Sequence, residues 1–162
     1  MKTTLNAIRA RGPCAEGWKK LLTYLGKTEA DDEPLSLLMI LDSNGLDDAL
    51  WALRAVEGYD REKRLYAVWC ARQVKHLLID QRSLNALEVA ERFARGRATR
   101  EELDAALDAA WAAALDAAGA AARAAARAAW DAWDAWDAQV AELRRLCECV
   151  DAGVDPYPEE AL

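Results

Sequence analysis

The sequence predicts an all-α protein with a compact head of several helices, followed by one long alanine-rich amphipathic helix. Three observations predict this class. Residues 99–150 contain no proline and are dominated by alanine, which has the best intrinsic helix propensity. Leucine and tryptophan recur at three- and four-residue spacings before this stretch. Alternating apolar–polar runs bounded by turns, the pattern of strands, are absent. We therefore divide the chain into a helical head (1–98), a long Ala/Trp-rich helix packing on the head (99–151) and an irregular tail (152–162).

Turn and cap residues place the helices of the head. Gly12-Pro13 separates the first two helices, and the turn Ser43-Asn44-Gly45 ends the third. Gly26, Gly58 and Gly96 act as stops, because glycine is the commonest residue just past a helix. The predicted helices cover residues 3–10, 13–25, 35–41, 46–56, 61–79 and 84–94. The helix at 61–79 is apolar over more than half its circumference, so we expect it at the centre of the head.

The long helix begins with a capping box, since Thr99 is followed three residues later by Glu102. Its large side chains fall on one face at about 100° per residue. This apolar stripe keeps its phase across Gly119, and a chain reversal there would have no reason to preserve the phase. The pattern therefore favours one continuous helix. A helical hairpin broken at Gly119 stays open as the alternative, because a glycine costs about 1 kcal/mol in a helix interior.

The charge is distributed unevenly along the chain. The net charge is −7; residues 1–98 carry 16 basic and 14 acidic side chains, and residues 99–162 carry 5 and 14. An acidic helix argues against nucleic acid as the partner, because phosphates are bound by lysine and arginine. It suits a basic protein surface. No apolar run reaches membrane-spanning length and no signal peptide opens the chain, so we expect no membrane partner and a cytoplasmic location.

A tryptophan cluster in the long helix is the strongest candidate for a binding surface. Its members, Trp130, Trp133 and Trp136, are spaced by three residues, so their indoles spread over about 120° of the helix circumference. This is wider than the contact surface of one packed helix. Aromatic residues, tryptophan above all, dominate the energetics of protein interfaces. The predicted partner-binding residues are Trp130, Trp133, Trp136, Asp131, Asp134, Asp137 and Trp111.

Catalytic and metal-binding patterns are weak. His76 and Asp80 are four residues apart, and a histidine oriented by a carboxylate can act as a general base. We favour a structural pair, because no nucleophile or second histidine accompanies them. Cys147 and Cys149 would point about 200° apart on a helix and could not share one metal ion. The sequence therefore predicts no catalytic, cofactor-binding or metal-binding residues, and reduced cysteines.

Two segments carry a family resemblance. They are REKRLYAVWCARQVKHLL (61–78) and DQRSLNALEVAERFARG (80–96), followed by an EEL helix start and an alanine-rich helix. They resemble a family of immunity proteins found in bacteria and in phage or prophage genomes, and residues 9–56 look like the N-terminal part of phage-encoded members. The resemblance implies an all-helical fold and a binding role inferred from gene context. It carries no established catalytic residues.

Taken together, these patterns predict a phage- or prophage-encoded, non-enzymatic module that binds a bacterial protein and inhibits or neutralises it. In the cytoplasm of a bacterial host, the target would be a defence complex, which gives an anti-defence role, or a toxin. Two alternatives remain open at this point. One is a structural, self-assembling protein that forms a homodimer through the long helix. The other is an enzyme that uses His76.

Overall fold

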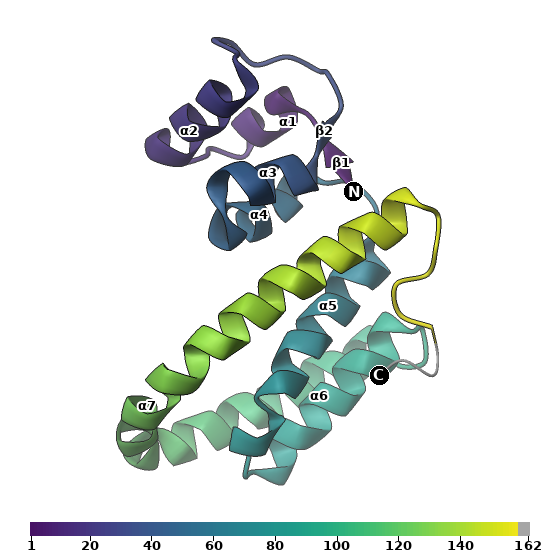
Figure 1. The fold of residues 1–162 in the computed structure, drawn as a ribbon. Coiled ribbons are helices and arrows are strands. Elements are labelled where there is room, and N and C mark those ends of the chain that lie inside the picture. Colours follow the sequence, from purple (N-terminus) through teal and green to yellow (C-terminus); the bar gives the residue numbers. More distant parts are fainter. Residues whose placement is uncertain (159–162) are drawn as a thin grey trace. The chain divides into compact units, whose positions relative to one another are not determined.

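The computed structural model describes residues 1–158, and the side chains of residues 1–113 and 136–158. It confirms the all-α class (Figure 1). The helices are α1 (Leu5–Ala10), α2 (Ala15–Leu25), α3 (Leu37–Asn44), α4 (Leu46–Ala52), η1 (Leu53–Ala55), α5 (Asp60–Gln73), η2 (Lys75–Leu77), α6 (Gln81–Ala94) and α7 (Arg100–Asp151). Two short strands, β1 (Lys2–Thr3) and β2 (Leu35–Ser36), pair antiparallel. Among the described residues, no helix combines the length and the apolar character needed to cross a membrane.

The chain forms two compact units that differ from the predicted ranges 1–98, 99–151 and 152–162. The first unit comprises Met1–Tyr59 and Val140–Pro156, and the second comprises Asp60–Gln139 and Tyr157–Leu162. The predicted head is thus divided after Tyr59. The last turns of α7 belong with the N-terminal helices, and the first turns of α7 belong with α5 and α6.

The first unit is built around leucine and isoleucine side chains of its helices. Those that are fully or almost fully buried include Leu5, Ile8, Leu37, Ile40, Leu46, Leu143 and Leu146. The strand pairing aligns Lys2 with Ser36 and Thr3 with Leu35. The Thr3 hydroxyl also donates to the Ala55 carbonyl at 2.6 Å. The strand pair was not predicted, because two residues are too few to show a period of two.

The second unit contains the hairpin of α5 and α6, whose helices lie side by side (Figure 1). Glu91 of α6 binds two arginines, Arg72 and Arg95, and its Oε1 accepts from Arg95 Nε at 3.1 Å. The tail has no regular secondary structure over residues 152–158, yet Tyr157 is buried. Its carbonyl accepts from Arg61 at 3.0 Å.

The helix predicted for 61–79 is shorter than expected and is not buried along its whole length. α5 ends at Gln73, and residues 74–80 turn the chain back into α6. The Asp80 carboxylate caps α6 by accepting from the Arg82 backbone amide at 2.8 Å. Leu77, which the apolar pattern placed in the core, is 49% exposed, and Ile79, the last residue of the predicted helix, is 91% exposed. The apolar residues between α5 and α6 extend the helical spacing of hydrophobic residues in the sequence, although the helix itself has already ended.

The predicted capping box at the start of α7 is confirmed. The Glu102 amide donates to the Thr99 hydroxyl at 3.2 Å, and the Thr99 amide donates to the Glu102 carboxylate at 2.7 Å. Arg100 lies over the ring of Phe93, and the Gln139 carbonyl accepts from the Tyr66 hydroxyl at 3.1 Å. Arg100 and Gln139, both in α7, therefore contact the same α5–α6 hairpin. They lie closer together than the roughly 58 Å that a straight helix would set between them. Helix α7 extends from Arg100 to Asp151 and includes Gly119, so the backbone is helical across this glycine.

Candidate protein-binding groove

An open apolar groove of about 510 Å³ lies in the second unit, on three of its helices. Its lining comes mainly from Ala67, Val68 and Ala71 of α5, Ala86, Leu87, Ala90 and Phe93 of α6, and Leu103, Leu107 and Ala110 of α7. Alanine is the commonest of these residues. Alanine side chains are too short to fill the space between the three helices at the protein surface, and this leaves the groove open.

The apolar surface continues from the groove along α7. Leu103, Leu107 and Trp111 are spaced by four residues and therefore share one side of the helix. Leu103 is buried, but Leu107 is 50% exposed and Trp111 is 69% exposed. Continuous apolar surface of this kind typically marks an interaction site on a soluble protein. Trp111 is one of the predicted partner-binding residues, and the structure places it beside the groove.

Two arginines flank one end of the groove and face the same aromatic ring. The guanidinium of Arg64 lies 5.0 Å, and that of Arg100 5.8 Å, from the centroid of Phe93. Arg100 makes an exposed ion pair with Asp104 at 3.8 Å, and Arg64 has no acidic partner within residues 1–113 and 136–158. A guanidinium stacked on a ring keeps its N–H edge free, and this edge can bind a carboxylate through two parallel hydrogen bonds. The groove therefore pairs an apolar floor with a cationic end.

Sequence reasoning missed this cationic end. Arg64, Phe93 and Arg100 come from three separate helices, and only the folded hairpin brings them together. The chain has a single phenylalanine, and its position one residue before the end of α6 was the one local signal available.

The predicted tryptophan cluster is only partly described. Trp136 is 41% exposed and Asp137 is also exposed, and neither lines the groove. Trp130, Asp131, Trp133 and Asp134 lie outside the residues whose side chains are described.

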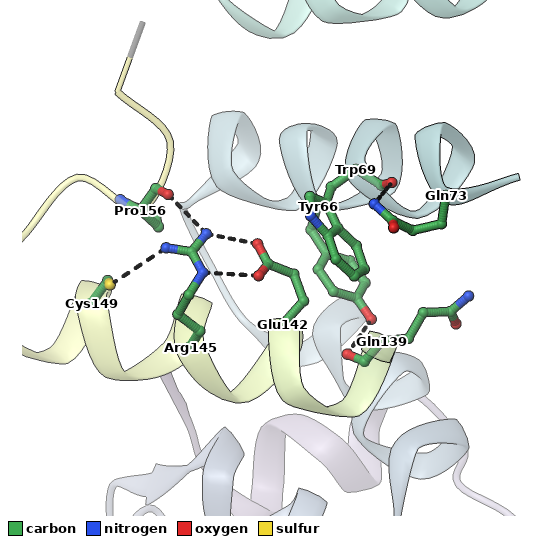
Figure 2. Close-up of polar contacts among 8 residues, drawn as sticks. All are labelled: Tyr66, Trp69, Gln73, Gln139, Glu142, Arg145, Cys149 and Pro156. Atoms are coloured by element: carbon green, nitrogen blue, oxygen red, sulfur yellow. Dashed lines mark hydrogen bonds and ion pairs between the residues drawn. The ribbon is translucent and has the colours of Figure 1, made fainter. Parts of the chain in front are cut away.

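Figure 2 draws two polar clusters, one from each unit, whose contacts are structural. In the second unit, Tyr66 stacks on Trp69 with ring centroids 6.5 Å apart and donates to the Gln139 carbonyl. In the first unit, Arg145 binds Glu142 at 2.8 and 2.7 Å and donates to the Pro156 carbonyl at 2.9 Å. These hydrogen bonds hold the chain segments together, so we do not assign the two clusters a ligand.

The structure does not form the predicted pair of His76 and Asp80. The two residues lie in the connection between α5 and α6 and do not share a helix. The Asp80 carboxylate binds the Arg82 guanidinium at 3.1 and 2.9 Å as well as the Arg82 backbone. These bonds lower the pKa of Asp80, with the Arg82 side chain as the main cause. A carboxylate committed to Arg82 does not orient a histidine as a general base.

Disulfides and metal-binding groups are absent among the described residues. Cys14, Cys70, Cys147 and Cys149 are not linked by disulfides. Within residues 1–113 and 136–158, no three histidine, cysteine, aspartate or glutamate side chains gather closely enough to hold a metal ion.

No family model, curated protein or solved structure matches the chain.

Proposed function

We propose that this protein is a non-enzymatic binding module whose groove receives an acidic amphipathic helix of a partner protein. One observation carries the proposal: an open, alanine-lined apolar groove ends at two guanidinium groups that stack on Phe93. The apolar part would supply affinity, and the arginines would select a partner with a carboxylate at the matching position.

The shape and lining of the groove favour a helix. A partner helix laid in a groove contacts it through apolar residues at three- and four-residue spacings. The side chains of Leu107 and Trp111 follow such a spacing and are already exposed. Covering them would gain roughly 25 cal/mol for each Å² of apolar surface removed from water. The small side chains of Ala86 and Ala90 would let a partner helix approach closely.

The charge at the end of the groove favours an acidic partner. Arg64 and Arg100 present two positive charges within about 6 Å of one ring centroid. Both side chains are exposed at present, so a carboxylate could reach them without breaking a buried contact. Electrostatic complementarity of this kind contributes mainly to specificity and to the rate of association.

The role of the bound state follows from the family resemblance. Under this proposal the module inhibits or neutralises a bacterial protein, either a defence complex or a toxin, in the cytoplasm of the host cell. No step of the proposal uses a catalytic residue, a cofactor or a metal ion. Self-association through the exposed apolar surface is the alternative that the experiment must separate.

The test captures a partner from bacterial lysate, purifies it and measures its affinity for four forms of the protein. The wild type is compared with Leu107→Asp, Arg64→Glu and the control Ile79→Asp, which changes an exposed apolar residue of the same unit outside the groove. We expect the first two variants to weaken binding at least about tenfold, because each removes a contact that typically contributes 1–3 kcal/mol. Ile79→Asp should bind like the wild type.

Two results would contradict the proposal. The first is unchanged affinity of Leu107→Asp and Arg64→Glu for every captured protein. The second is a stable dimer of the wild type in sedimentation that Leu107→Asp dissociates, which would assign the groove to a second copy of the chain. Thermal unfolding of each variant separates loss of the groove from loss of the fold.

A further inference from the structure

The first unit contains a second site, independent of the groove. A cavity of about 210 Å³ lies among α1, α2, α3 and α4, with apolar side chains such as Ile8, Leu21 and Ile40 in its lining. Two tryptophans, Trp18 of α2 and Trp51 of α4, also line it. The cavity is smaller than the roughly 300–1,000 Å³ of pockets for drug-sized ligands, so it would admit a group of about side-chain size.

The charged groups that line this cavity are both carboxylates, Asp47 and Asp48. Asp48 is half-buried, and its Oδ2 accepts from Asn44 Nδ2 at 2.7 Å. The same Asn44 nitrogen donates to the Gly17 carbonyl at 2.8 Å, so the amide and the carboxylate are held against α2. Within residues 1–113 and 136–158, no lysine or arginine pairs with Asp48. The lining of the cavity therefore carries negative charge, and the cation bound to Asn44, the Lys20 ammonium, contacts the Asn44 carbonyl at 3.4 Å and not Asp48.

The backbone of α2 is shaped to admit this carboxylate. A methyl group added at Gly17 would stand 2.6 Å from Asp48 Oδ2 and 3.2 Å from Asp48 Cγ. A helix-interior glycine costs about 0.5–1 kcal/mol relative to alanine, yet only glycine leaves room for the carboxylate here. Gly17 and Asn44 together keep the carboxylate in the lining of the cavity.

The two indoles add a second preference for positive charge. The face of a tryptophan ring attracts cations more strongly than that of any other side chain. Trp51 already makes one such cation–π contact, because the Arg54 guanidinium lies 5.4 Å from its ring centroid. Arg54 does not line the cavity, so that contact leaves the cavity itself open.

We propose that this cavity binds an alkylammonium group, either primary or methylated, on a short hydrocarbon arm. The arm would lie against the apolar side chains and the indoles, and the nitrogen would approach Asp48. A lysine side chain of another protein and a free aliphatic amine share this chemistry. The site uses no residue of the proposed protein-binding groove, so neither proposal depends on the other.

The probe is n-butylammonium, compared with the neutral 1-butanol, and the readout is the indole N–H signals of the folded protein in ¹⁵N NMR. Weak, saturable binding in the millimolar range should shift the signals of Trp18 and Trp51 and leave that of Trp111 in place. The alcohol should cause no saturable shift. Asp48→Asn should weaken binding at least about tenfold, because it removes the charge that faces the nitrogen. The control Glu57→Gln changes an exposed carboxylate of the same unit that does not line the cavity, and it should bind like the wild type.

A second arm separates the two sources of the ligand. A lysine blocked at both backbone ends is titrated beside n-butylammonium. Equal or tighter binding of the blocked lysine supports a protein side chain as the natural ligand. Its exclusion, with n-butylammonium still bound, supports a free amine. The proposal is overturned if 1-butanol binds as well as the ammonium, if folded Asp48→Asn keeps the wild-type affinity, or if neither amine gives a saturable shift of the two indoles.

Discussion

Replacing Gly17 with alanine tests the packing of the cavity, because two effects of known sign oppose each other there. Gly17 lies inside α2, where alanine would normally stabilise a helix by about 0.5–1 kcal/mol. The new methyl group would also stand 2.6 Å from Asp48 Oδ2 and 3.1 Å from Cys14 Sγ. Side chains do not approach this closely, so the carboxylate must move.

The cost of that movement decides the sign. When Asp48 turns away, it loses the 2.7 Å hydrogen bond from Asn44. Hydrogen bonds to a charged group contribute about 1.5–3 kcal/mol, and the half-buried position of Asp48 favours the lower end of that range. Subtracting the helix gain leaves a net destabilisation of about 1 kcal/mol for Gly17→Ala. In an Asp48→Ala background the methyl group meets no carboxylate, and the Cys14 sulfur at 3.1 Å needs to shift only slightly, so the same substitution should stabilise by up to about 0.5–1 kcal/mol.

The assay is urea unfolding of four proteins: the wild type, the two single variants and the double variant. The expected coupling between the two sites is about 1.5–2 kcal/mol, well above the few tenths found for independent sites. The slope of the free energy against urea should stay constant, which shows that the compared states are the same. Additive effects, or stabilisation by Gly17→Ala in both backgrounds, would refute the close contact with Asp48.

Three further predictions concern stability. Burial raises the pKa of the Cys147 thiol from 9.0 to about 11, so the folded state keeps a proton that the unfolded state loses. The free energy of unfolding should therefore fall by roughly 2–3 kcal/mol between pH 9 and 11. Denaturant titrations measure this fall. Cys147→Ala should remove this part of the pH dependence, and the control Cys149→Ala should keep it. Thr99→Ala should cost about 1 kcal/mol in thermal unfolding through loss of the capping box, and Thr99→Ser should cost little. Glu91→Gln should cost about 2 kcal/mol, because the two arginines that it binds would lose their charged partner, whereas Glu88→Gln on the exposed face of α6 should be neutral in the same measurement.

Features that depend on neighbours in the sequence could be predicted. Gly26 adopts the left-handed conformation with φ +64° and ends α2, as its place after an amphipathic run indicated. The capping box of Thr99 and Glu102 needs only residues three apart, and it forms as expected. Features that depend on distant segments could not be predicted. Lys2 pairs with Ser36 in β1 and β2, and no local pattern marks either strand.

The same distinction explains which site residues were found. Trp111 was named as a candidate because it lies on the apolar stripe of α7, and it is 69% exposed. Arg64 gave no signal, because its stacking on Phe93 exists only once α5 and α6 have packed together. Asp48 lies in the first turn of α4, where the helix dipole already accounts for an acidic residue. Its approach to Gly17 requires the packing of α2 against α3 and α4, so its position in the cavity lining was missed.

The groove and the cavity have opposite charges and share no lining residue. They belong to different compact units, and each unit has its own buried side chains. Arg64→Glu should therefore leave binding of n-butylammonium unchanged, and Asp48→Asn should leave capture of an acidic helix unchanged. Because substitutions at independent sites are expected to act additively, each variant is a control for the other. Loss of both kinds of binding by a variant that still unfolds at the wild-type temperature would contradict this independence.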